Sequence, residues 1–377
     1  MNKRITTLLI LVGALMKALL RGRANRIPKL PPESIVGMLL TKNVGDMIFA
    51  TSVFRALKEK YPTCRLTVVG SKKNAITLSG NKDVDRYIVN PESAWELVDL
   101  LKMERADYGF TLANSSSDIA TMFLAGVNAI ACFDVQNAPG AHTRVYSLVK
   151  NICIQVPYYV GQYCSQEYLR ILEPINIFST NTSKYLFYST ETRSKVRDQF
   201  LKQGTDIEKD KIAVISPGAG TKSKLWPAER FAEVADFLVE HGFKIAVIGG
   251  PGDKEEVELF KLKLKTINIL DASSLSLEEL FYFISKCKLL MANDSGPIYM
   301  AESFKVPTLV VVGPTDEFEH PPRGPLNVVV TPNRDNEAPE MRGHIMGYSE
   351  EKAREQIQKV TVEEVLRTLN ILVEKIA

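Results

Sequence analysis

Two short segments in opposite halves of the chain carry residues that could perform group-transfer chemistry. Gly45-Asp46 and Asn293-Asp294-Ser295-Gly296-Pro297 each follow an apolar run and open a helical pattern. Loops of this kind lie at the carboxyl edge of a parallel sheet, where the amino ends of helices collect anions and ligands. Two such loops, one in each half, predict two facing α/β domains with a substrate between them.

Asp46 is the candidate catalytic residue. A carboxylate exposed at the edge of a sheet could take a proton from an incoming hydroxyl, and such a base contributes ~10²–10⁴ in rate. An aspartate at the start of a helix is also a common N-cap, with hydrogen bonds worth about 1 kcal/mol. Both interpretations hold together if Thr41 or Asn43 caps the helix instead.

A glycine-rich loop at residues 217–227 is the first part of a candidate phosphate-binding site. Lys224 supplies a point charge suited to phosphate, and the Trp226-Pro227 pair with the amphipathic helix after it makes the pattern more specific than a tight turn. Small residues would let backbone amides approach an anion closely, and these are Gly218, Ala219 and Gly220.

Two further loops complete this candidate site for a phosphate-containing ligand. Gly249-Gly250 ends the next strand and is either a tight turn or, beside the previous loop, a seat for a nucleotide base and ribose. Ser295 and Gly296 would present N–H groups and a helix dipole to a diphosphate. Asp294 is wrongly charged for phosphate, so we expect it to bind sugar hydroxyls unless it is only a helix cap. Tyr299 and His320 could line the same pocket.

Composition excludes several classes of protein. The chain has 377 residues, 45% of them apolar and 24% charged, which suits two soluble globular domains. The net charge of +3 comes from residues 1–32, which hold seven cations and no acid and leave the rest weakly acidic. No basic stripe runs through the folded part, so nucleic acid is not an expected partner. Five scattered cysteines favour neither a disulfide framework nor a metal site and suit a reducing cytoplasm.

The basic amino-terminal segment contains an apolar run from Leu8 to Met16 that extends to Leu20 beyond Lys17. The run is short of the roughly 20 residues that span a bilayer. Three interpretations stay open: a helix lying on a membrane surface, a tilted signal-anchor, and a helix packed on the protein itself. The first predicts a peripheral protein on the inner face of the cytoplasmic membrane.

Short apolar strands alternate with helical stretches, which predicts parallel sheets covered on both faces. The alternation stops in the polar residues 174–186 and then restarts, so the boundary between two Rossmann-like domains is placed there. Polar residues 333–349 predict a surface loop. The predicted parts are residues 1–32, a first domain at 33–180, a second at 181–350 and a carboxyl-terminal helix at 351–377.

Several of these segments together resemble glycosyltransferase family 9, the ADP-heptose:lipopolysaccharide heptosyltransferases and their relatives. The resemblance covers about residues 35–330. It rests on four segments: Gly45-Asp46 through Tyr61-Pro62, Gln166 through Leu172, Pro217 through Pro227, and Asn293 through Pro297.

The resemblance implies a GT-B fold, with the acceptor bound by the first domain and a nucleoside-diphosphate sugar by the second. It implies inverting transfer without a metal or other cofactor, with Asp46 as the base and Lys224 on the donor phosphates. It places Asp294, Ser295 and Gly296 in the donor loop, and Gly45 and Lys42 beside the acceptor. Tyr299 departs from the histidine usual in the family, which puts the specific sugar in question more than the reaction class.

The sequence therefore predicts an enzyme that moves a sugar, heptose by resemblance, onto a saccharide or glycolipid acceptor of the cell envelope. Two other interpretations stay open. A nucleotide-sugar epimerase could use the same paired domains but would need no acceptor. A catalytically silent nucleotide-sugar binder would bind the donor and transfer nothing, and Tyr299 is the residue that keeps this alternative open.

Overall fold

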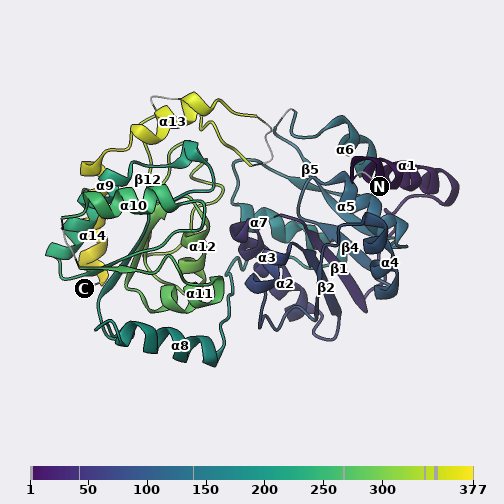
Figure 1. Ribbon diagram of the computed structural model, residues 1–377. Coiled ribbons are helices and arrows are strands. Elements are labelled where there is room, and N and C mark those ends of the chain that lie inside the picture. Colours follow the sequence, from purple (N-terminus) through teal and green to yellow (C-terminus); the bar gives the residue numbers. More distant parts are fainter. Residues whose placement is uncertain are drawn as a thin grey trace. The chain divides into compact units, whose positions relative to one another are not determined.

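The computed structural model describes residues 3–41, 43–138, 140–265, 268–334, 337–343 and 347–376. These form two compact units, one ending at Ser183 and the other beginning at Lys184. Each unit contains one six-stranded sheet flanked by helices (Figure 1). The predicted architecture of two parallel-sheet α/β units is confirmed.

The sheet of the first unit has the order β3-β2-β1-β4-β5-β6, and every neighbouring pair is parallel. Its central strands are apolar and wholly buried, as expected where helices cover both faces. The strands are β1 (Ser34–Leu39), β2 (Arg65–Gly70), β3 (Arg86–Val89), β4 (Tyr108–Thr111), β5 (Ile130–Val135) and β6 (Ile154–Tyr158).

The helices of the first unit pack in two groups. One group is α2 (Val44–Lys60), α3 (Lys72–Thr77) and α7 (Cys164–Leu169). The other is α1 (Lys3–Arg21), α4 (Ala94–Glu104), α5 (Ser116–Leu124) and α6 (Arg144–Val149). The 3₁₀ helix η1 (Lys150–Ile152) lies between α6 and β6, and the 3₁₀ helix η2 (Arg170–Ile175) follows α7. Serine or threonine side chains cap α3, α4, α5 and α6, which accounts for where these helices begin.

The amino-terminal helix α1 packs on α5, with Ile10 and Ala14 fully buried between them. The chain after it makes a parallel bridge from Ala24 to Cys153 and an antiparallel bridge from Asn25 to Ala129. The helix is thus fastened to the first unit, as one of the three interpretations of this segment predicts. Within the residues that the structure describes, no helix combines the length and apolar character needed to cross a bilayer.

The second unit repeats the plan with the order β12-β11-β10-β7-β8-β9, again wholly parallel. Its central strands β7 and β10 are buried at every residue. The strands are β7 (Ile212–Ser216), β8 (Lys244–Val247), β9 (Ile269–Asp271), β10 (Leu289–Asn293), β11 (Thr308–Val311) and β12 (Asn327–Val330).

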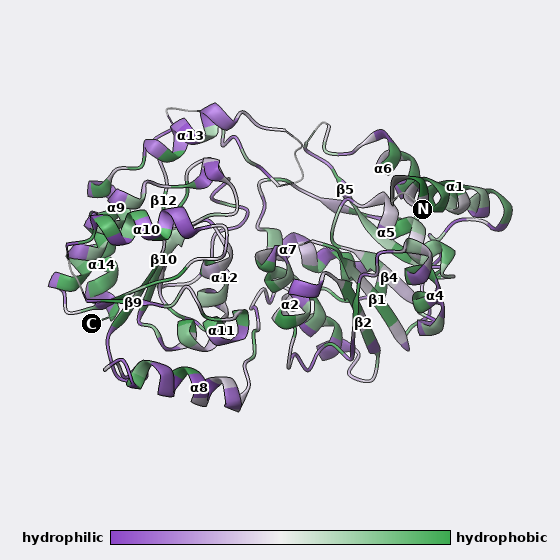
Figure 2. Ribbon diagram, in the orientation of Figure 1, coloured by the Kyte–Doolittle hydropathy of each residue, from purple (hydrophilic) through white to green (hydrophobic). Residues whose placement is uncertain are grey.

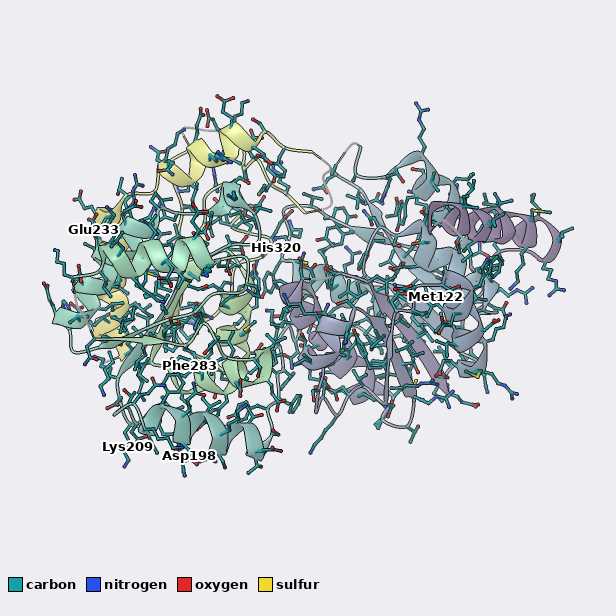
Figure 3. The ribbon with its side chains drawn as sticks, in the orientation of Figure 1. Met122, Asp198, Lys209, Glu233, Phe283 and His320 are labelled. Carbon is teal, nitrogen blue, oxygen red and sulfur yellow. The ribbon has the colours of Figure 1, made fainter. Side chains whose placement is uncertain are left out.

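The helices of the second unit also form two groups. The helices α8 (Thr190–Leu201), α11 (Leu277–Lys286) and α12 (Gly296–Ser303) pack together. Phe283, labelled in Figure 3, points from α11 into this layer and stacks on Phe200 of α8. The other helices are η3 (Lys222–Lys224), α9 (Ala228–Glu240), α10 (Lys254–Lys263), α13 (Glu350–Gln358) and α14 (Val362–Ile376).

Three details differ from the sequence-based expectations. Residues 351–377 were expected to form one helix, but the described part contains two, because the chain turns between Gln358 and Val362. The helix after Trp226 was expected to contain Pro227 in its first turn, but Pro227 is the N-cap of α9 and lies just before that turn. Strands β6 and β12, at the edges of their sheets, were not predicted. Strand β6 contains Pro157, and β12 is only partly buried.

All five cysteines are buried and free. The polar segment predicted as a loop has no helix or strand in its described residues 333–334, 337–343 and 347–349, apart from an isolated bridge between Thr315 and Met341.

A carboxylate is buried where β4 meets α5 in the first unit. Asp118 accepts hydrogen bonds from the hydroxyls of Thr111, Ser115 and Ser117. Burial raises the pKa of Asp118 to about 6, and these three hydroxyl donors limit the rise. A group whose pKa is raised by folding stabilises the fold below the unfolded pKa and ceases to do so as the pH passes the folded pKa.

We therefore expect the free energy of unfolding to fall between about pH 4 and pH 6 by about 3 kcal/mol from Asp118 alone. Asp118→Asn removes the ionisation, and Thr111 can still donate to the carbonyl of Ala113 at 3.2 Å. Urea unfolding of both proteins across this range measures the difference. A difference that does not change with pH would show that Asp118 titrates as an ordinary aspartate.

Candidate active site

The first cluster of candidate residues lies at the carboxyl end of β1. Thr41 and Asn43 connect this strand to α2, and Asp46 is the third residue of that helix. Asp46 Oδ2 accepts hydrogen bonds from Thr41 Oγ1 at 2.7 Å and from Asn43 Nδ2 at 3.2 Å. The N-cap position is Asn43, whose side chain makes no capping bond. Asp46 is therefore not an N-cap, and that alternative for this residue is wrong.

The two oxygens of the Asp46 carboxylate are used differently. Oδ2 carries both hydrogen bonds, whereas Oδ1 has no partner among the residues that the structure describes. The side chain is only partly exposed. One oxygen is thus held by the protein and the other is available to a ligand, which is the arrangement required of a general base.

The environment of Asp46 is set by the start of α2 and by α7. Gly45, a predicted acceptor-site residue, is buried directly before Asp46, and Lys42, the other, lies outside the described residues. Tyr168 of α7 is buried close enough that burial, with a smaller contribution from the charge of Asp46, raises the pKa of its hydroxyl well above the usual range. This residue belongs to the segment that resembles family 9 but was not predicted to lie near Asp46.

The second cluster lies at the carboxyl edge of β7, β8 and β10, which are neighbours in the sheet. Asn293, fully buried at the end of β10, donates to the carbonyls of Pro217 and Gly218 at 2.9 and 3.2 Å. Its own oxygen accepts from the backbone N–H of Trp226 at 3.0 Å. One amide side chain therefore joins the loop after β7 to the loop after β10.

Gly218 joins the loop after β7 to the loop after β8. A Cβ atom at this position would overlap the carboxyl group of Asp253, so only glycine allows this approach. Asp253 in turn accepts from the backbone N–H of Gly250 at 2.7 Å. Ala219 and Gly249 are half-buried beside this contact, whereas Gly220 and Gly250 are exposed. The structure thus brings all three predicted donor loops to one edge.

Lys224 and Asp294 form an ion pair that the sequence did not predict. Lys224 Nζ lies 2.9 Å from Asp294 Oδ2, and the hydroxyl of Tyr299 donates to Asp294 Oδ1. Burial alone would raise the pKa of Asp294, but Lys224, His320 and the Tyr299 hydroxyl outweigh it and hold that pKa well below its usual range. Asp294 is therefore a carboxylate, with Lys224 left two further N–H donors for a ligand.

The amino end of α12 is open for an anion. Ser295 is its N-cap without a side-chain capping bond, and Gly296 is its first residue. The backbone N–H groups of these two residues have no acceptor among the described residues. Ser295 Oγ instead donates to the carbonyl of Asn293 at 3.2 Å. Free amides at a helix amino end attract phosphate.

His320, labelled in Figure 3, lies in the loop between β11 and β12 and contributes charge to the environment of Asp294. The sequence suggested His320 and Tyr299 as pocket residues, and both act on this carboxylate. The sequence singled out Asn293 only as part of its motif, and it did not predict that Asn293 and Asp253 connect the loops. Within the described residues, no group of three or more histidine, cysteine or acidic side chains is arranged to hold a metal ion.

Two six-stranded parallel α/β units, each with candidate site residues at the carboxyl edge of its sheet, have the GT-B architecture that the sequence predicts. The profile of glycosyltransferase family 9, described as heptosyltransferase, matches residues 95–347. The chain belongs to this family, and the predicted resemblance is confirmed.

Individual relatives agree with this assignment. The chain is 23% identical over 297 residues to lipooligosaccharide heptosyltransferase 2 of Haemophilus influenzae, covering 74% of the chain and 83% of that protein. It is 32% identical over 283 residues to lipooligosaccharide heptosyltransferase 2 of Campylobacter jejuni, covering 72% and 79%. Its fold is similar to that of E. coli ADP-heptose lps heptosyltransferase II, with a TM-score of 0.70 and 20% identity over 91% of the chain and 99% of that structure.

The ion pair in the second unit yields a direct test. Lys224→Met removes the counter-ion of a buried carboxylate, so we expect the free energy of unfolding to fall by about 1–3 kcal/mol. The lower end allows for the partly exposed Lys224 side chain. Lys222→Met, at an exposed position two residues away, should change it by less than about 0.5 kcal/mol. Equal urea-unfolding curves for the two variants would contradict the ion pair.

Proposed function

We propose that this glycosyltransferase moves heptose from ADP-heptose onto a saccharide acceptor of the lipopolysaccharide core, with inversion and without a metal. The donor and pathway are supported by the names of its relatives, which include lipopolysaccharide heptosyltransferases and an ADP-heptose-dependent enzyme of known structure. The observation that carries the mechanism is the Asp46 carboxylate. Two hydrogen bonds hold one of its oxygens, and no described residue binds the other.

In the proposed step the acceptor hydroxyl gives its proton to Asp46. The acceptor oxygen then forms a bond to the anomeric carbon of the donor from the face opposite the diphosphate. The bond between that carbon and the diphosphate oxygen breaks, and ADP leaves with the electron pair. The first unit would bind the acceptor and the second the donor.

The second unit offers groups that suit the departing diphosphate. Lys224 would contact its phosphates, and the free amides of Ser295 and Gly296 would stabilise its developing charge. Gly218, Ala219, Gly220, Gly249 and Gly250 would allow the nucleotide to approach the backbone. Asp294, held as an anion by Lys224 and Tyr299, would accept hydrogen bonds from sugar hydroxyls. Closure of the units would exclude water and limit hydrolysis.

We expect Asp46→Asn to lower transfer from ADP-heptose by at least about 10²-fold, because an amide cannot take the hydroxyl proton. The thermal stabilisation of the protein by ADP should be unchanged, and ADP should stabilise more than UDP or GDP. Asp99→Asn, at an exposed aspartate of α4, is the matched control and should transfer normally.

Other outcomes of this experiment separate the alternatives. Full transfer by Asp46→Asn would contradict the proposed base. A wild-type protein that alters the donor sugar without an acceptor would be an epimerase. A wild-type protein that binds donors but transfers none of them would be a silent binder.

We also propose that α1 places the enzyme on the inner face of the cytoplasmic membrane. Ile5, Leu9, Val12, Met16 and Leu19 recur every three or four residues, which puts them on one side of the helix. All five are exposed, and they lie opposite the side that packs on α5. Figure 2 shows α1 as mainly hydrophobic. Since residues 1–32 carry seven cations and no acid, this surface is complementary to anionic lipid.

The membrane proposal is tested with vesicles of phosphatidylglycerol and phosphatidylethanolamine. The wild type should sediment with them, less so at high salt, and bind phosphatidylcholine vesicles weakly. Leu9→Ser with Met16→Ser should weaken binding by about 10-fold or more, given roughly 1.5–3 kcal/mol for each buried side chain. Leu262→Ser, at an exposed leucine of α10, is the control. A wild type that stays in solution with every vesicle would rule the proposal out.

A further inference from the structure

The loop between β1 and α2 is built around the Asp46 carboxylate. Thr41 is the nearer donor, with its hydroxyl 2.7 Å from Oδ2, and Asn43 Nδ2 approaches the same oxygen at 3.2 Å. Thr41 Oγ1 also accepts a hydrogen bond from the backbone N–H of Asn43 at 3.0 Å. The backbone bond uses a lone pair of the hydroxyl oxygen. Since a carboxylate can only accept, Thr41 donates its single hydroxyl proton to Asp46.

This loop is in turn held by the neighbouring helix α3. Asn74 is fully buried, and its Nδ2 donates to the carbonyl of Thr41 at 2.9 Å and approaches the carbonyl of Asn43 at 3.5 Å. Asn74 lies in the first turn of α3, where its backbone N–H bonds to Ser71. The side chain that fixes the loop therefore comes from the helix that follows β2, the strand next to β1 in the sheet.

Two donors on one oxygen have a chemical consequence. A carboxylate that is free to rotate presents either oxygen in many orientations, whereas two directional bonds to Oδ2 fix the plane of the group. The lone pairs of Oδ1 then point in fixed directions within that plane. Preorganisation of this kind matters because a misplacement of about 1 Å can cost about 10²-fold in rate.

We infer that Thr41 and Asn43 are positioning residues, which hold Asp46 so that Oδ1 alone receives the acceptor proton, and that Asn74 sets the loop that carries them. This inference rests on the proposed function, because it assigns roles around the proposed base. None of the three residues is required to touch the donor. Their loss should therefore act on the chemical step and leave donor binding intact.

The test compares Thr41→Val, Thr41→Ser and Asn43→Ala in the full-length enzyme with ADP-heptose and acceptor. Thr41→Val should lower kcat about 10- to 100-fold while KM for the donor changes less than about twofold. Thr41→Ser keeps the hydroxyl and should stay within about threefold of the wild type. Asn43→Ala, at an exposed position that is unlikely to disturb folding, should also lower kcat selectively.

Thr67→Val is the matched control. The hydroxyl of Thr67, a residue of β2, donates to the buried carboxylate of Glu104 at 2.6 Å. The variant loses the same kind of hydrogen bond but should leave kcat unchanged.

Asn74→Ala tests the contact between α3 and the loop that carries Thr41 and Asn43. It should lower kcat in the same selective way, and ADP should still stabilise the variant protein against heat. If Asn74→Ala or Thr41→Val fails to fold, Asn43→Ala still tests whether the loop positions Asp46.

The possible results distinguish this inference from the proposed function. A wild-type kcat in Thr41→Val and Asn43→Ala, with transfer abolished in Asp46→Asn, would overturn the positioning role and leave the base in place. Full transfer by Asp46→Asn would overturn the proposed function itself. A rise in donor KM without a change in kcat would assign Thr41 to binding and would also overturn the inference.

Discussion

The parallel direction of the strands is the constraint on which both clusters depend. In each unit every strand runs the same way, so the loops that follow the strands meet at one edge of the sheet. Asp46 and Asn74 lie in the first turns of the helices that follow β1 and β2, and they are connected through Thr41. In the second unit, Asn293 and Gly218 connect loops that are far apart in the sequence for the same reason.

The two clusters treat their carboxylates in opposite ways. Asp294 is buried and uses both of its oxygens within the protein, one on Lys224 and one on Tyr299. Asp46 is partly exposed, and the described part of the chain binds only one of its oxygens. The first arrangement fixes a permanent charge that can orient a ligand, whereas the second leaves a basic atom for chemistry. The contrast follows from the number of donors around each group and its exposure to water.

Much of the fold could be predicted because its signal is local. Apolar strands such as β1 and β10 are buried along their whole length, and helices begin at residues such as Ser93 that cap them. The edge strand β6 carries a weaker signal, because Pro157 interrupts it. The edge strand β12 was missed although it contains three consecutive valines. The break within the carboxyl-terminal segment depends on packing that residue periodicity does not express.

The candidate site was predictable in its residues and less so in their partners. Asp46, Lys224 and the turn at Ser295 carry recognisable local patterns. The pairing of Lys224 with Asp294 joins residues 70 positions apart, and the contact of Gly218 with Asp253 depends on how two loops approach each other. Such contacts follow from the sheet order, which a single sequence does not specify.

The central claim is that Asp46 and the donor loops serve one reaction. The most direct measurement is a crystal structure of the enzyme with a non-transferable ADP-heptose analogue and a saccharide acceptor. The account predicts an acceptor hydroxyl about 2.6–3.2 Å from Asp46 Oδ1, with the diphosphate on Lys224 and the amides of Ser295 and Gly296. An acceptor hydroxyl placed against a different base, or a diphosphate bound away from Lys224, would contradict it.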